Sequence, residues 1–136
     1  MTFTPDVAES LNNLGGLYYH QGKYPQAEPL YQRASGIREQ VLGPLHPDLA
    51  TTINNLALLY YHQDKYTQTE PLNQRALAIR EQVLGPLHPD LATTLNHLAR
   101  LYTKQERYVK VNREQEAQVL LNRVQEVRVN SANGLP

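Results

Sequence analysis

Apolar side chains recur at helical spacing near the start of the chain. Between Val7 and Tyr18 the large apolar residues follow one another at intervals of four, three, three and one residue, which places them on one side of a helix. Residues 4–6, Thr-Pro-Asp, combine an N-cap residue, a proline suited to the first helical position and an acidic residue for the positive end of the helix dipole. A glycine-containing stop follows at 21–23. The pattern predicts a helix between these two signals.

A second apolar stripe begins at Tyr24 and continues to Val41, mostly in steps of three or four residues. It ends at residues 42–44, where a glycine is followed by a proline. Pro29 and its copy Pro71 fall close to the helix start, where they predict a tightened or kinked first turn. The two stripes together predict a pair of helices joined by a short turn.

The chain then repeats itself with a period of 42 residues. Residues 7–48 and 49–90 share 30 identities in 42 positions, and residues 49–66 and 91–108 share 11 in 18. After Tyr108 the identity ends. We therefore predict one domain over residues 1–130, a flexible tail at 131–136, and within the domain three units at 4–48, 49–90 and 91–129.

Two helices of this length cannot bury their apolar stripes alone, whereas stacked helix pairs form a continuous core. The predicted fold is therefore all-α, an α-solenoid of about three helical hairpins. The last predicted helix, 109–129, keeps apolar residues at Ala117, Leu120, Val124 and Val127 and is otherwise polar. Solenoids need terminal helices with a polar outer face, so we interpret it as a C-terminal cap. Its 3, 4, 3 spacing also fits a heptad seam, and a self-association helix is the alternative.

The residues of the first unit match the tetratricopeptide repeat (TPR) signature. Residues 11–18 have its large apolar residue, its Leu-Gly pair and its tyrosine, and Ala27 and Tyr31 match its later alanine-to-aromatic step. Because period and motifs agree over residues 4–108, the chain resembles the 42-residue repeat of kinesin light chains and of similar bacterial and fungal proteins. The stretches that carry this resemblance are 53–60, 63–66, 70–72 and 75–90. It implies a right-handed TPR superhelix and a non-catalytic scaffold whose concave face holds an extended peptide.

In TPR stacks the first helix of each pair lines the concave groove. The side of these helices that faces away from the Leu14–Tyr18 stripe supplies the candidate peptide-binding residues. They are Asn12, Asn13, Tyr19, His20, Asn54, Asn55, Leu58, Tyr61, His62, Asn96, His97, Arg100 and Lys104.

Asparagine occupies one register in all three units, at Asn12, Asn54 and Asn96. Asparagine is a mediocre helix former, and its amide both donates and accepts hydrogen bonds, as a clamp on an extended peptide backbone requires. The alternative is that Asn13 and Asn55 bond to neighbouring helices and that the recurrence of asparagine at 12, 54 and 96 is only a remnant of the duplication. Tyr19 and Tyr61 offer flat apolar contact to a partner, or else cover neighbouring helices.

Charge and composition limit the partners. Lysine plus arginine and aspartate plus glutamate both number 13, so the net charge is zero, which argues against nucleic acid and against anionic membrane surfaces. Arg100 and Lys104 lie at one end of the predicted groove, where an acidic peptide segment would complement them. The chain has no cysteine and no secretory signal, and we expect a cytoplasmic protein.

The histidines do not form a recognisable catalytic or metal motif. His20 and His62 share a register, as do His46 and His88, but no HExxH or CxxC pattern occurs, and we expect no enzyme activity, metal or cofactor. At the N-terminus Thr4 replaces the histidine of the His-Pro-Asp motif, which a helix start would tolerate and a catalytic site would not. We therefore interpret His46 and His88 as helix caps between hairpins.

The predicted function is a protein-interaction scaffold that holds a partner's peptide. The alternative is a structural or self-associating module, a homodimer through the solenoid ends with no peptide ligand.

Overall fold

The computed structural model describes residues 5–105 and 112–133, with side chains described for 6–105 and 115–133. These residues form six helices and no strand, which confirms the all-α prediction. The helices are α1 (Pro5–His20), α2 (Tyr24–Leu42), α3 (Pro47–His62), α4 (Tyr66–Leu84), α5 (Asp90–Gln105) and α6 (Asn112–Ala132).

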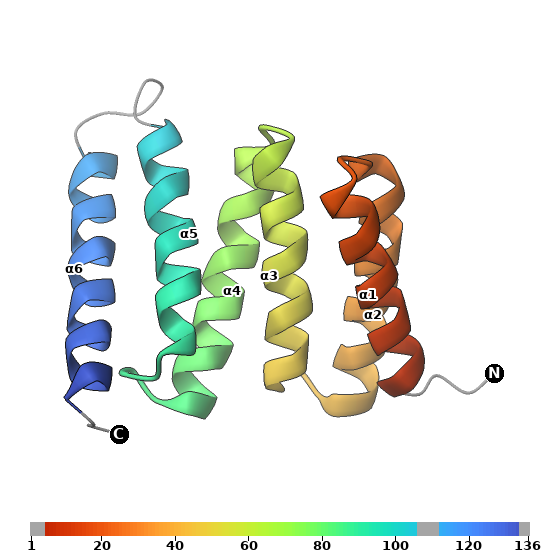
Figure 1. Cartoon of the computed structure of the whole chain (residues 1–136), viewed down its shortest axis with the longest axis horizontal. Helices are drawn as coiled ribbons and strands as arrows, with labels where there is room; N and C mark the ends of the chain where they lie inside the picture. The colour runs from red at the N-terminus through yellow and green to blue at the C-terminus, as the bar shows by residue number, and fades with distance from the viewer. Residues whose placement is uncertain (1–4, 106–111, 134–136) are drawn as a thin grey trace.

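The helices pack as three consecutive hairpins, α1 with α2, α3 with α4 and α5 with α6. In addition, α2 packs on α3 and α4 packs on α5, so each hairpin rests on the next. Figure 1 shows the hairpins in a row, with the first hairpin and α6 at opposite ends of the stack. None of the helices in the described part of the chain is long and apolar enough to cross a membrane.

The turns inside the first two hairpins each need a residue with left-handed backbone geometry. Gly22 supplies it in the first turn with φ 74°, and Asp64 occupies the equivalent position in the second with φ 60°. A side chain makes this conformation costly for any residue other than glycine, although aspartate tolerates it better than most. The Asp64 carboxylate accepts a hydrogen bond from the Tyr66 hydroxyl at 3.0 Å. The second turn therefore carries strain that the first turn lacks.

The connections between hairpins are helix starts, as the sequence predicts. The Nδ1 atom of His46 accepts a hydrogen bond from the backbone N–H of Asp48 at 3.1 Å and caps α3. His88 makes the same bond to Asp90 at 3.2 Å. Both histidines thereby satisfy a backbone donor that a helix start leaves free.

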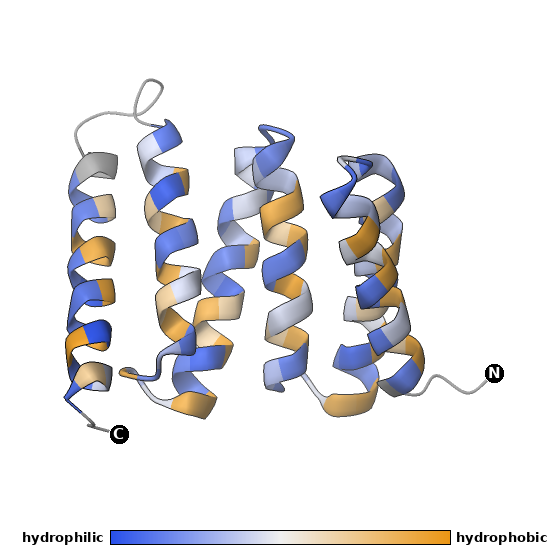
Figure 2. Cartoon of the chain, in the orientation of Figure 1, coloured by the Kyte–Doolittle hydropathy of each residue, from blue (hydrophilic) through white to orange (hydrophobic). Residues whose placement is uncertain are grey.

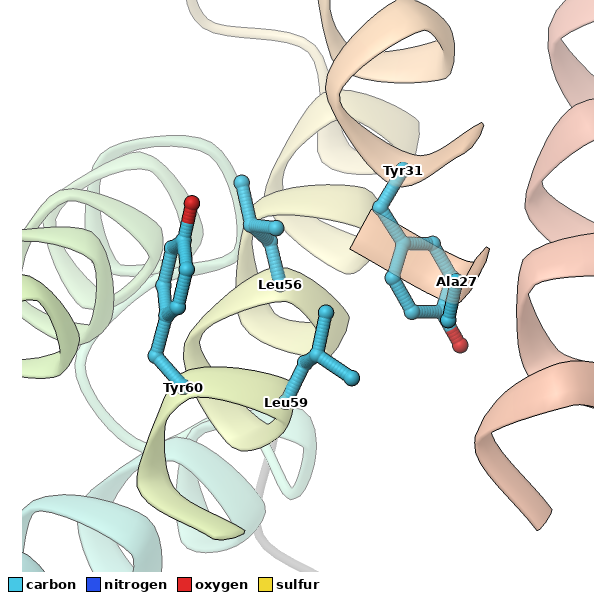
Figure 3. Packing of buried hydrophobic residues seen from close by; sticks show 5 residues of the cluster. All are labelled: Ala27, Tyr31, Leu56, Leu59 and Tyr60. Carbon is cyan, nitrogen blue, oxygen red and sulfur yellow. The ribbon is translucent and has the colours of Figure 1, made fainter. Parts of the chain in front are cut away.

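The core between the first two hairpins joins α2 to α3. Ala27 and Tyr31 of α2 pack with Leu56, Leu59 and Tyr60 of α3, and all five side chains are buried. Figure 3 shows Tyr31 facing the two leucines from the opposite helix. At the second junction Thr69 and Asn73 stand in the places of Ala27 and Tyr31, and a different residue of α4, Leu77, packs against the buried leucines of α5.

A glycine makes room for Tyr31 inside the first hairpin. A Cβ atom built on Gly15 would lie 2.8 Å from Cε1 of Tyr31, which is closer than packed carbon atoms approach. The second hairpin has Ala57 and Asn73 at the equivalent positions, 42 residues later, and both are buried. The larger side chain on one helix is thus paired with the smaller residue on the other.

Polar bonds repeat at both junctions. The Tyr60 hydroxyl donates to Glu28 and the Tyr102 hydroxyl to Glu70, at 2.7 and 3.1 Å. Gln32 and Gln74 each donate to the same tyrosine oxygen at 3.2 Å. Arg38 donates to the hydroxyl of Thr52, and Arg80 to that of Thr94, both at 2.6 Å. Burial lowers the pKa of Arg80.

The apolar stripe of α1 is less buried than its sequence pattern predicts. Leu14 is 41% exposed and Leu17 is 55% exposed. Their equivalents Leu56 and Leu59 are 7% and 0% exposed, because α2 covers them. Figure 2 shows the apolar positions along each helix in orange. The stripe was expected to be packing surface, and in α1 it is only partly covered.

The apolar stripe of α6 packs on α5. Ala117, Leu120, Val124 and Val127 occupy the same places as Thr69, Leu72, Ala76 and Ile79 of α4, each exactly 48 residues later in the sequence. Arg123 pairs with Glu81 as Arg75 pairs with Glu39, which gives the same register.

The offset of 48 instead of 42 means that six additional residues separate the helices of the third hairpin. The predicted helix start at 109 lies outside the described residues. The additional residues fall between Gln105 and Gln115, where the description of the chain is interrupted. At its other end α6 continues to Ala132, so Ser131 and Ala132, which the sequence assigned to a tail, are helical.

Candidate functional site

The candidate groove is formed by the first helices of the three hairpins. α1 contacts α3 and α3 contacts α5 along one side of the stack. In Figure 1, α1 and α3 lie in front of α2 and α4. We call the surface of α1, α3 and α5 that carries the candidate residues the groove face.

Of the three asparagines that share one register, Asn12, Asn54 and Asn96, the first two join neighbouring helices. The amide oxygen of Asn12 accepts a hydrogen bond from Nδ2 of Asn55 at 3.2 Å and lies 3.3 Å from the Thr52 hydroxyl. One unit later, the amide oxygen of Asn54 lies 3.3 Å from Nδ1 of His97. Asn54 is only 6% exposed. These oxygens therefore hold the first helices together. The alternative prediction assigned such bonds to Asn13 and Asn55, and of these two Asn55 makes one, to Asn12.

The other asparagines of the candidate set, Asn13, Asn55 and Asn96, are more exposed than Asn54. Asn13 is exposed, and Asn55 and Asn96 are half-buried. No hydrogen bond to another described residue is recorded for the side chains of Asn13 and Asn96. These two are the positions where the groove face has amide groups for a ligand.

A hollow of about 550 Å³ lies between α1 and α3. Its walls combine amides, aromatic rings and an aliphatic floor, a mixture that suits both the backbone and the side chains of a peptide. The lining residues are Asn12, Asn13, Gly16, Leu17, Tyr19, His20, Tyr31, Asn55 and Leu58.

Aromatic rings pack at the end of the first hollow. Tyr19 lies 5.7 Å from Tyr24 and 5.6 Å from His62, measured between ring centroids, and His62 stacks on Tyr24. His20 packs edge-on against Tyr19. Burial raises the pKa of Tyr19, and burial with the nearby charge of Arg100 lowers that of His62. Tyr19 therefore braces α1, α2 and α3 while one side still lines the hollow.

A second hollow of about 310 Å³ lies toward α5 and α6 and is cationic. Arg100 and Lys104 line it together with Tyr61, and both cations are exposed. The Arg100 guanidinium lies over the Tyr61 ring, 5.3 Å from its centroid. No ion pair with a described residue is recorded for either cation. A carboxylate entering this hollow would find two positive charges and an aromatic wall.

His97 lies between the two hollows. It borders a narrow gap of about 10 Å³ with Leu58, Tyr61, Asn73 and Arg100. Burial, then the positive charges of Arg100 and Arg80, then His62, lower the pKa of His97 to about 4. The imidazole is therefore neutral near neutral pH, and its contact with Asn54 is a hydrogen bond between neutral groups.

Several residues that line the hollows are absent from the set predicted from the sequence. On the first helices these are Gly16, Leu17, Ala99 and Thr103. Two others come from second helices: Tyr31 of α2 lines the first hollow and Leu121 of α6 lines the second. The equivalent residue of α4, Asn73, lines the gap between them. The sequence does carry a signal for this position: the first two repeats are largely identical, yet one has Tyr31 where the other has Asn73.

His20, His62 and His97 lie on the groove face, but they do not form a metal-binding group. Among the described residues, no group of three or more histidine, cysteine, aspartate or glutamate side chains is placed to hold a metal ion. His46 and His88, the other histidine pair, are at the helix caps described above.

The structure resembles those of several repeat proteins. BtubC (BKLC) of P. vanneervenii superposes with a TM-score of 0.83 at 26% identity, over 93% of this chain and 48% of that one. The nearly identical TPR-like repeats of a Podospora anserina protein designated a kinesin light chain give 0.79 at 23% identity, over 96% and 59%. This chain thus spans about half the length of these two.

A further structure is less similar. The N-terminal domain of stress-induced protein-1 of C. elegans gives a TM-score of 0.69 at 18% identity, over 93% and 88% of the two chains. Comparison with curated proteins finds no match.

The family is shown by sequence. The model of the tetratricopeptide repeat matches residues 6–68 and 48–129, which together cover most of the chain. Proteins of this family generally mediate protein–protein interactions and are generally non-catalytic. With its 42-residue period, its hairpin stack and its structural similarity to kinesin light chain-like proteins, this chain belongs to the tetratricopeptide repeat family.

Proposed function

We propose that the groove face binds an extended peptide of a partner protein, with an acidic side chain of that peptide in the hollow of Arg100 and Lys104. The observation that carries the proposal is that two exposed cations, Arg100 and Lys104, line the second hollow together with the Tyr61 ring, while amides line the first hollow on the same face. Structures similar to this chain include kinesin light chain-like TPR proteins, and TPR proteins generally bind protein partners.

The chemistry of the groove face defines the peptide. Asn13 and Asn96 offer amide donors and acceptors that match the backbone of an extended chain. Leu58 and Tyr61 lie between the amide end and the cationic end, where they would contact apolar side chains of the peptide. Asn54 does not contact the ligand in this proposal, because it is buried against His97.

The test is a display selection of random peptides on the immobilised chain, followed by affinity measurement for the enriched sequences. We expect enrichment of peptides with acidic residues. Charge reversal by Arg100→Glu should weaken their binding about tenfold or more, since each tenfold corresponds to about 1.4 kcal/mol. Asn96→Ala should weaken it about threefold to tenfold, through the loss of about one hydrogen bond.

Arg33→Glu is the matched control, because Arg33 is exposed on α2, away from both hollows. The proposal fails if no peptide is enriched, or if the enriched peptides bind the Arg100→Glu and Arg33→Glu variants equally well.

A further inference from the structure

The outer face of α1 has the composition of a buried helix junction, but no helix in the described part of the chain covers it. Leu14 and Leu17 are 41% and 55% exposed, whereas the equivalent leucines of α3 and α5 are at most 7% exposed. Those equivalents are Leu56, Leu59, Leu98 and Leu101. The difference is in the neighbours: α2 covers α3, and α4 covers α5.

The two occupied junctions show what chemistry covers such a face. At each one, a glutamate and a glutamine of the covering helix meet a tyrosine hydroxyl, and an arginine meets a threonine hydroxyl. The residue of the covering helix at one further position differs: Tyr31 packs against the leucines at the first junction, whereas its equivalent Asn73 borders the gap beside His97 at the second. The polar bonds are the same in both copies, so they are a general property of the interface and not one local contact.

α1 keeps the receiving half of this interface. Ser10 takes the place of Thr52 and supplies the hydroxyl, and Tyr18 takes the place of Tyr60. Ser10 is exposed, and no hydrogen bond to another described residue is recorded for either hydroxyl. The face thus combines partly exposed leucines with two hydroxyl groups in the register that α2 and α4 would contact.

α6 presents the covering half on its outer side. With the 48-residue offset, Gln118, Asn122 and Arg128 stand where α4 has Glu70, Gln74 and Arg80. All three are exposed, and Gln118 donates to Asn122 at 3.0 Å; in α4 the equivalent pair is bonded in the opposite direction, from Gln74 to Glu70 at 3.2 Å. Leu121, at the position of Asn73, is 44% exposed.

We propose that a second copy of this chain covers α1, and that it does so with its α6, head to tail. Arg128 then meets the Ser10 hydroxyl, Gln118 and Asn122 meet the Tyr18 hydroxyl, and Leu121 packs against Leu14 and Leu17. The contact continues the internal repeat of the chain from one molecule to the next. It joins different surfaces of the two copies, so it leaves a free end on each and adds further copies in a row.

The differences between α6 and α4 set the strength of the contact. Gln125 replaces the apolar Leu77, and Gln118 replaces the charged acceptor Glu70. Both changes weaken the interface compared with the internal junctions, so the association is concentration-dependent and reversible. The reverse changes give a direct test by gain of function: Gln125→Leu, alone or with Gln118→Glu, should tighten the association at least about tenfold.

The experiment is sedimentation or light scattering of the whole chain over a wide concentration range. The wild type should increase in average mass with concentration up to the millimolar range. Leu14→Glu blocks the α1 face and Leu121→Glu blocks the α6 face, so each variant alone should be monomeric. Val83→Glu is the control, since Val83 is similarly exposed at 46% but lies on neither face. Circular dichroism shows whether each variant keeps its helices.

The decisive step is to mix the two blocked variants. A head-to-tail contact gives a one-to-one dimer that grows no further, because each variant still has one intact face. The proposal is overturned if the wild type stays monomeric, if the mixture stays monomeric, or if Leu121→Glu associates like the wild type. The last result would show that two α1 faces, or other surfaces, meet instead. None of these outcomes depends on peptide binding to the groove face.

Discussion

Acidification should destabilise the fold through His97. The usual histidine pKa is 6.5, and in the folded chain the value falls to about 4. Between these two values the unfolded chain binds more protons than the folded chain, so the free energy of unfolding decreases as the pH falls from 6.5 toward 4. Above pH 6.5 the contribution of His97 is fully present.

The size of this effect follows from the two pKa values. At pH 5 the linkage relation gives a loss of about 2 kcal/mol relative to pH 8. His97 is only half-buried, so solvent screening reduces this, and we expect about 1 to 1.5 kcal/mol. The groups that face the imidazole are Asn54, which hydrogen-bonds it, and the charges of Arg80, Arg100 and His62.

The variant His97→Asn restores the residue type that the first two units have at this position and removes the titrating group. Urea unfolding followed by circular dichroism, at pH 7.5 and pH 5, gives the stability difference for both proteins. The wild type should lose about 1 to 1.5 kcal/mol more than the variant on acidification. His20→Asn removes an exposed histidine from the same face and serves as the control. An equal loss in wild type and His97→Asn would refute the reasoning.

Three further predictions concern the frame that holds the groove face, each measured by urea unfolding. Gly15→Ala should lower the free energy of unfolding of the wild type, because the added Cβ meets the Tyr31 ring. In a Tyr31→Leu background the same substitution should raise it by about 1 kcal/mol through helix propensity. A change of the same sign in both backgrounds would count against the packing argument. Asp64→Gly should add about 0.5 to 1 kcal/mol by relieving the positive φ, and a loss would show that the Tyr66 hydrogen bond matters more. His88→Ala should lose about 1 kcal/mol with the helix cap, and no loss would mean that the cap is not stabilising.

The sequence predicts the hairpins well because glycine and proline mark their ends. The second helix was placed from Tyr24 to Leu42, which is where α2 lies, and the caps at His46 and His88 were identified from the Thr4 substitution. These features depend on local chemistry, which a single chain segment carries within itself.

Whether a side chain is buried depends on the helices beside it, so the pattern of apolar and polar residues alone does not predict burial. Leu14 and Leu56 are the same residue in the same local sequence, yet one is 41% exposed and the other 7%. Asn54 is polar and buried because its partner, His97, comes from the next unit. The register of α6 could not be read either, because sequence identity ends before the six additional residues. Its role in the second hollow, through Leu121, therefore appears only in the structure.

The central claim is that the face of α1, α3 and α5 binds an extended acidic peptide. The most direct measurement is an NMR titration of the isotope-labelled chain with a display-selected peptide. The account predicts saturable shifts of backbone amides that cluster along the two hollows, at residues such as Gly16, Asn55 and Arg100, with little change in the outer side of α2. Shifts confined to the outer surfaces of α1 or α6, or spread without reference to the hollows, would contradict it.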